Sequence, residues 1–299
     1  MIITKYRTLI FWITGVILAV AIGAVVYLGL PLGIDFTGGS LMQVRYPEGR
    51  PALGVVQEQV ATVPLGAVSV RESGADAIVM RTHAMTPEEH AAVLAALSQD
   101  AEPVELAYTS VGPAFGGQFA TKSLWALLAV ALAIGLYVAF AFRKVSRPIP
   151  SWVYGVIVLA MLVHDLIVPA GFYAIFAHFT GAEVDALFVT ALLALLGYSV
   201  NDTIVVFDRI REHLAHNEKN SIKEPFELTI GKSIAETLTR SLNTSLTTAL
   251  ALVALVFFGA EATRSFALVM LVGVVAGTYS SILVAAPLLV PFAKWYVKK

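Results

Sequence analysis

Apolar runs of about 20 residues recur six times along this chain, and they limit what it can fold into. Each run is long enough to cross the roughly 30 Å hydrocarbon core of a bilayer as a helix. Only 14% of the 299 residues are charged, whereas a soluble domain of this length carries roughly 25% charged residues. The sequence therefore predicts a polytopic α-helical membrane protein with spans at about 9–30, 117–142, 152–177, 184–208, 234–259 and 263–292.

The basic residues indicate how these spans are oriented. Lysine and arginine occur before the first run, between the second and third, between the fourth and fifth, and after the sixth. On the opposite side, the two short loops have Arg264 as their one lysine or arginine. By the positive-inside rule we expect both termini to be cytoplasmic and the long segment 31–116 to lie outside the cell membrane. The basic turn at 143–151 supports this topology, and residues 1–30 then form the N-terminus and a retained first span.

The segment 31–116 is predicted to be the one external domain. Alternating apolar residues predict strands at 41–46, 67–72, 77–82 and 104–110, and helices are expected at 51–63 and from Thr86 onwards. This βαββαβ order is typical of a ferredoxin-like α+β fold. The segment carries ten acidic residues and four arginines, so we expect no nucleic-acid partner.

Residues 117–299 form the remaining five-helix bundle, with a charged cytoplasmic loop at 209–233. In that loop Ile222, Phe226 and Ile230 are spaced by four, which predicts an amphipathic helix lying at the membrane interface. At the end of the fourth span, Asp208 and Arg209 are interpreted as an ion pair. In the sixth span, Gly273 to Gly277 form a small-residue face that is typical of close helix packing.

A carboxylate interrupts the fourth apolar run. Asp202 follows the apolar stretch 186–196, and Tyr198 and Ser199 share its face of the helix, whereas Asn201 lies about 100° round and Thr203 follows directly. An ionised side chain inside a membrane costs about 3 kcal/mol on insertion scales, so such a residue is a candidate functional site. We interpret Asp202 as a proton or ion site, with a static structural role as the alternative.

The fifth span offers a positive counterpart to this carboxylate. Arg240 lies inside it, with Thr237 one turn earlier and Asn243, Thr244 and Thr247 continuing a polar stripe. Counted from the predicted span ends at 1.5 Å per residue, Arg240 and the carboxylate on the fourth span both lie roughly 9 Å from the cytoplasmic boundary. They are therefore able to pair. The alternatives are that Arg240 extends toward the cytoplasm or pairs with Glu236 four residues earlier.

Two further ionisable residues, His164 and Asp165, lie near the middle of the third span, shortly before Pro169. They are second candidates: either one joins a proton relay, or neighbouring helices satisfy both. Gly197 is interpreted as a site of close helix packing. No Ser-His-Asp set, metal-ligand spacing or nucleotide motif is found, and there is no cysteine. We therefore expect no hydrolytic activity, no cofactor and no metal site.

Four motifs together resemble a known family. They are GIDFTGGS at 33–40, SVGP at 110–113, GYSVNDTIVVFDRIRE at 197–212 and SIAETLTRSL at 233–242. The chain, including its six spans and large first external loop, is similar over essentially its whole length to the SecF family of protein-export membrane subunits. The fourth-span motif is highly specific, and the glycine motif is shared with SecD.

The resemblance implies a half-transporter of the resistance-nodulation-division superfamily in the bacterial inner (cytoplasmic) membrane. Such a subunit pairs with SecD into a twelve-span assembly and uses proton motive force in late preprotein export beside SecYEG, with YajC, YidC, preprotein substrates and the lipid bilayer as further implied partners. Asp202 and Arg240 match the positions that the family uses in proton conduction. The alternatives are a proton-driven efflux half-transporter for small molecules or lipids, and a scaffold that uses no proton.

Overall fold

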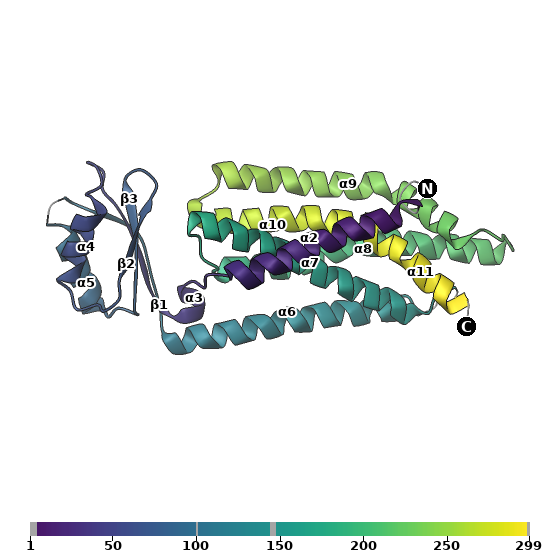
Figure 1. Ribbon diagram of the computed structural model, residues 1–299, viewed down its shortest axis with the longest axis horizontal. Coiled ribbons are helices and arrows are strands. Elements are labelled where there is room, and N and C mark those ends of the chain that lie inside the picture. The colour runs from purple at the N-terminus through teal and green to yellow at the C-terminus, as the bar shows by residue number, and fades with distance from the viewer. Residues whose placement is uncertain (1–4, 100, 144–147, 298–299) are drawn as a thin grey trace. The chain divides into compact units, whose positions relative to one another are not determined.

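A computed structural model describes residues 5–99, 101–143 and 148–297. The chain divides into two units, residues 1–31 with 125–299 and residues 32–124. Six helices among the described residues are long and apolar enough to cross a membrane (Figure 1), as the apolar runs predict. They are α2 (Arg7–Leu28), α6 (Pro113–Ala141), α7 (Ser151–Thr180), α8 (Ala186–Lys219), α9 (Phe226–Phe258) and a sixth span made of α10 (Glu261–Tyr279), η1 (Ser280–Ala285) and α11 (Ala286–Val297).

The sixth span lies at the centre of the helical unit. Its helix α10 packs against α7, α8 and α9, whereas α2 packs mainly on α7. The small-residue face explains this position, because a side-chain carbon at Gly273 would overlap Leu195 and one at Gly277 would lie 3.0 Å from Ser199. The prediction that Gly273 to Gly277 form a face for close helix packing is confirmed. The interpretation of Gly197 as a close-packing site is wrong, since no atom lies within 4 Å of a side-chain carbon built there.

Local signals set the ends of the central helices. Asp185 caps the start of α8 by accepting a hydrogen bond from the Phe188 N–H at 2.8 Å, and Gly181 ends α7 in a left-handed conformation. The predicted interfacial helix at 209–233 is wrong: α8 continues to Lys219, and α9 begins at Phe226 directly after Pro225. No glycine or proline interrupts residues 209–219, so the charged turns simply extend the spanning helix. Residues 144–147 of the basic turn predicted at 143–151 lie outside the described residues.

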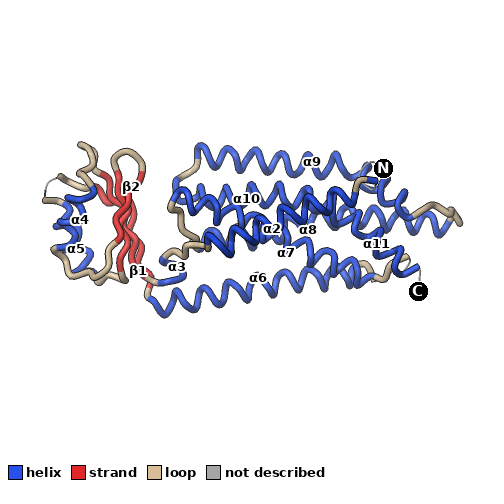
Figure 2. Tube along the Cα trace, in the orientation of Figure 1, coloured by secondary structure: helices blue, strands red, loops and turns tan. Residues whose placement is uncertain are grey.

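The other unit, residues 32–124, contains the predicted βαββαβ domain (Figure 2). Its elements are β1 (Gly39–Arg45), α4 (Leu53–Ala61), β2 (Ser69–Ser73), β3 (Ala77–Thr82), α5 (Pro87–Leu97) and β4 (Val104–Val111). The four strands form one antiparallel sheet in the order β2-β3-β1-β4. Met42, Ile78 and Met80 are fully buried in its core together with Val56 and Val93 of the two helices. The fold expectation is confirmed.

The glycine-rich motif that leads into β1 has a steric explanation. After the short helix α3 (Ile34–Thr37), Gly38 and Gly39 have φ angles of +74° and +130°. A side-chain carbon at Gly38 would lie 2.6 Å from the Pro113 backbone, and one at Gly39 would lie 2.7 Å from the Thr82 carbonyl oxygen. Glycine is therefore required at both positions, because the residue must adopt positive φ while another backbone passes at close range.

A π-helical turn, η1, interrupts the sixth span at Ser280–Ala285. The sequence pattern does not predict it, because its residues are as apolar and as small as those of the helices on either side. Such turns occur mostly as single insertions in α-helices, frequently at functional sites. Here Ser280 and Ser281, the first two residues of η1, are both fully buried.

Candidate functional site

The Asp202 carboxylate lies inside the helical unit and is only 5% exposed. Ser245 on α9 donates a hydrogen bond to Asp202 Oδ2 at 3.3 Å, and the Thr278 hydroxyl on α10 lies 2.7 Å from the Ser245 oxygen. Three helices thus meet around this one acidic side chain. The sequence identified Asp202 but missed Ser245 and Thr278. A signal was available, because Thr237, Ser241 and Ser245 share one face of α9 by spacing of four, and all three are buried.

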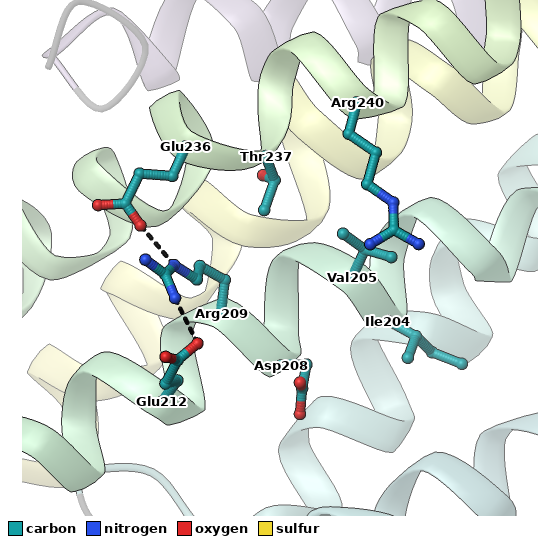
Figure 3. A pocket seen from close by; sticks show the side chains of 8 residues that line it. All are labelled: Ile204, Val205, Asp208, Arg209, Glu212, Glu236, Thr237 and Arg240. Atoms are coloured by element: carbon teal, nitrogen blue, oxygen red, sulfur yellow. Dashed lines mark hydrogen bonds and ion pairs between the residues drawn. The ribbon is translucent and has the colours of Figure 1, made fainter.

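Arg240 does not form an ion pair with Asp202 in this structure. Its charge acts on the carboxylate only through space. The side chain is exposed on α9 and lines a cavity of about 430 Å³ between α8 and α9 (Figure 3). The other lining residues are Ile204, Val205, Asp208, Arg209, Glu212, Glu236 and Thr237.

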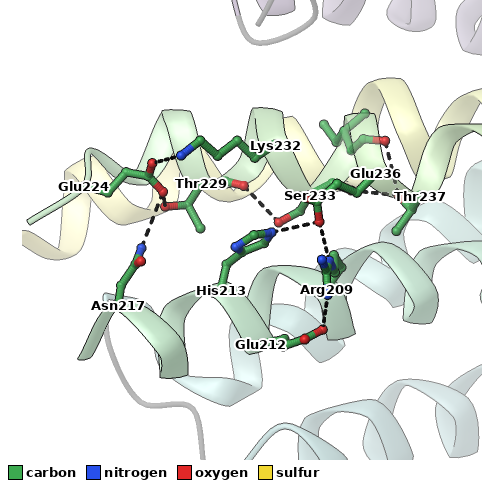
Figure 4. A network of polar contacts seen from close by, with 11 residues as sticks. Arg209, Glu212, His213, Asn217, Glu224, Thr229, Lys232, Ser233, Glu236 and Thr237 are labelled. Carbon is green, nitrogen blue, oxygen red and sulfur yellow. Dashed lines mark hydrogen bonds and ion pairs between the residues drawn. The ribbon is translucent and has the colours of Figure 1, made fainter. Parts of the chain in front are cut away.

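Ion pairs join α8 to α9 beside this cavity. Arg209 donates hydrogen bonds to both Glu212 and Glu236, and His213 Nε2 lies 3.0 Å from Glu236 Oε2 (Figure 4). Glu236 therefore belongs to this cluster, and its predicted alternative pairing with Arg240 is wrong. The interpretation of Asp208 and Arg209 as a pair is also wrong.

Asp208 pairs instead with Arg211, three residues further along α8. The geometry of a helix favours this choice, since residues three or four apart face each other and adjacent residues do not.

The four polar neighbours predicted on α8 lie in different surroundings. Ser199 and Thr203 are buried, whereas Asn201 is exposed. Thr203 Oγ1 lies 2.7 Å from Ser281 Oγ, so it joins α8 to the π-helical turn. Tyr198 donates a long hydrogen bond of 3.4 Å to the Thr244 carbonyl oxygen. Ser199 donates a hydrogen bond to a different carboxylate, that of Asp165.

The predicted polar stripe on α9 does not face the bundle. Asn243, Thr244 and Thr247 are exposed. The two threonine hydroxyls donate to carbonyl oxygens of their own helix, at 3.0 and 2.9 Å. Such backbone hydrogen bonds satisfy the hydroxyls without a second helix.

His164 and Asp165 lie together at the centre of the bundle. His164 Nδ1 lies 2.8 Å from Asp165 Oδ1, and the two residues are 3% and 2% exposed. Ser199 and Ser280 both donate hydrogen bonds to Asp165 Oδ2, the second at 3.0 Å. Tyr279 completes the cluster, with its hydroxyl 2.7 Å from His164 Nε2. Neighbouring helices satisfy both predicted residues.

No group of three His, Asp or Glu side chains placed to hold a metal ion occurs among residues 5–99, 101–143 and 148–297. Among the described residues of the helical unit, the buried polar side chains are two carboxylates, one imidazole and a set of hydroxyls. These groups are able to bind and pass protons.

Comparisons with known proteins agree with this geometry. A family model for the C-terminal part of the protein export membrane proteins SecD and SecF matches residues 91–295, and a model for the SecD/SecF GG motif matches residues 28–46. The chain is 40% identical over 289 residues to the protein translocase subunit SecF of Thermobaculum terrenum, which covers 91% of this chain and 89% of that protein. The chain belongs to the SecF family.

Two further similarities extend this assignment. The SecF subunit of Sebaldella termitidis is 38% identical to this SecF-family chain, over 87% of the chain and 81% of that protein. The crystal structure of SecDF from Thermus thermophilus, described as a translocon-associated membrane protein, matches 97% of the chain with a TM-score of 0.81 and 31% identity. A SecDF structure in its super-membrane-facing form matches 99% with a TM-score of 0.67 and 30% identity. The SecF-family chain spans 38% of the length of either SecDF chain.

Proposed function

We propose that this SecF-family membrane protein is a subunit of the Sec protein-export machinery that couples proton motive force to late preprotein translocation. The observation that carries the proposal is the burial of Asp202 inside a bundle that belongs to this family. A carboxylate in such surroundings is costly while it is ionised, and binding a proton removes that cost. Uptake and release of a proton at Asp202 is then the coupled event.

Arg240 supplies the opposing charge in this proposal. It lines the cavity beside α8, and its charge acts on Asp202 without a direct ion pair. An ionised Asp202 attracts the guanidinium, whereas a protonated Asp202 does not. Each proton bound or released therefore changes the force between α8 and α9, and the two helices shift their packing in response.

A separate partner half fits the surface of α9. The Asn243 side-chain amide is exposed on a helix that is otherwise apolar enough to span a membrane. Polar side chains at membrane depth face protein rather than lipid as a rule. We assign the covering half to SecD, and the SecYEG channel to the translocation step itself, because the matched SecDF chains contain more than this SecF-type portion. The cytoplasmic location of both termini and the external location of residues 32–124 follow from the same assignment.

The test is export into inverted membrane vesicles that hold this chain with SecD and SecYEG. Asp202→Asn keeps the shape of the side chain and removes its acid, so we expect the chain to insert normally and the proton-driven stimulation of export to be lost. Glu218→Gln is the matched control, since it removes an exposed carboxylate from the same helix outside the cavity that Arg240 lines. Full stimulation of export by the Asp202→Asn chain contradicts the proposal and favours the scaffold alternative.

A further inference from the structure

Asp202 is not the only acid inside the bundle. Asp165 on α7 is equally buried, and its hydrogen bonds come from His164, Ser199 and Ser280 rather than from the Ser245 hydroxyl that contacts Asp202. The proton cycle proposed above uses neither Asp165 nor His164. The pair therefore forms a second cluster of titratable groups with its own hydrogen-bond partners.

The contacts of this cluster are all satisfied when the His164 imidazole is neutral and the Asp165 carboxylate is ionised. In that state Asp165 Oδ2 accepts from two serine hydroxyls, and Asp165 Oδ1, which lies 2.8 Å from His164 Nδ1, accepts the Nδ1–H. With Nδ1 carrying the donated proton, a neutral imidazole has an acceptor at Nε2, and the Tyr279 hydroxyl donates to it at 2.7 Å. The pair then carries one negative charge inside an apolar bundle.

We propose that the His164–Asp165 pair is a second proton-binding site, distinct from Asp202. The incoming proton binds the lone pair of His164 Nε2, and the Tyr279 hydroxyl turns from donor to acceptor. The product is an imidazolium hydrogen-bonded to a carboxylate, so the net charge of the pair changes from −1 to zero. All existing contacts of Asp165 are kept, and only one hydroxyl rotates.

The elements around the pair leave few other charges to influence it. Tyr279 on α10 is the ionisable residue in direct contact. On α8, Asp202 lies one helical turn from Ser199, and Tyr198 adjoins that serine. On α2 the ionisable residues are at the two ends of the helix, on α11 they are in its last turns, and η1 has none.

Four consecutive residues of the sixth span connect the two acidic sites. Thr278 contacts Ser245 beside Asp202, Tyr279 contacts His164, and Ser280 contacts Asp165. Ser281 contacts Thr203 of α8. These residues lie where α10 becomes the π-helical turn η1, so a change of proton occupancy at either site acts on the same segment of the central span.

Nitrogen NMR of the full chain in lipid nanodiscs, with ¹⁵N-labelled histidine, tests the second site directly. His164→Gln identifies the His164 signals among those of the six histidines. We expect a neutral Nδ1–H tautomer at high pH that converts to imidazolium as the pH falls. Asp202→Asn should leave this conversion in place, because the two sites have separate ligands.

Tyr279→Phe tests the role of the tyrosine. A hydrogen bond to a charged group is worth about a factor of ten or more in an equilibrium, so the midpoint should shift by about one pH unit. Tyr173→Phe is the matched control: this buried tyrosine of the same α7 helix donates to the Glu183 carbonyl oxygen and does not contact the pair. If Tyr279→Phe does not fold, Ser280→Ala removes one donor to Asp165 and should also shift the midpoint.

Three results overturn the second site. They are a His164 signal that keeps one protonation state wherever the chain is folded, a neutral Nε2–H tautomer, and a conversion that disappears in Asp202→Asn. Each is independent of the export assay, which fails or succeeds according to Asp202. The two proposals therefore stand or fall separately.

Discussion

The substitution Gly38→Ala separates two physical demands on the glycine motif. Gly38 has φ and ψ of 74° and 166°, a region in which residues other than glycine cost about 1–3 kcal/mol. A side-chain carbon there would also lie 2.6 Å from Pro113 Cα, about 0.8 Å short of the 3.4 Å at which ordinary contact begins. Because backbone atoms have to move, overpacking adds about 1–3 kcal/mol. We expect a total destabilisation of about 2–6 kcal/mol.

Gly29→Ala is the matched control for this prediction. Gly29 has nearly the same φ and ψ, 73° and 175°, but no atom lies within 4 Å of a side-chain carbon built on it. Only the backbone penalty of about 1–3 kcal/mol then applies. Hydrogen exchange in the full chain measures the free energy of local opening at the amides that adjoin each glycine. Equal losses in the two variants would refute the reasoning from close approach.

Two further predictions concern helix packing and acid stability. Gly171→Ala places a side-chain carbon 2.5 Å from Ala21 Cα and should lower stability by about 1–3 kcal/mol. Gly197→Ala meets no such crowding and should raise stability by up to about 1 kcal/mol through helix propensity. A thermal unfolding temperature for Gly171→Ala equal to or above that of Gly197→Ala contradicts this prediction. The Thr86 backbone N–H holds the pKa of Glu89 below its ordinary 4.5. The ionised Glu89 therefore stabilises α5 above about pH 4.5, and this stabilisation is lost as the pH falls through the lowered pKa. If hydrogen exchange in α5 is as sensitive to acid in Glu89→Gln as in the unsubstituted chain, this role of Glu89 is excluded.

Burial patterns that repeat along the chain were readable from the sequence alone. The six spans and the βαββαβ domain follow from apolar run length and from alternation, both of which are properties of neighbouring residues. Asp202 was identifiable for the same reason, since a single acid stands out in an apolar run. The sequence did not predict that α8 and α9 are continuous helices, because charged helical turns have the same residue pattern in a longer span as in a separate surface helix.

The partners of the buried acids were decided only by the tertiary structure. Ser245 and Thr244 are adjacent on α9, yet Ser245 contacts Asp202 while Thr244 bonds to its own helix backbone. Hydroxyl side chains accept either arrangement, so the rotation and register of the packed helices select between them. The same packing brings Tyr279 and Ser280 onto the His164–Asp165 pair and leaves Arg240 beside a cavity. Sequence therefore determined which residues are costly in a membrane, and only the fold determined which hydroxyls offset that cost.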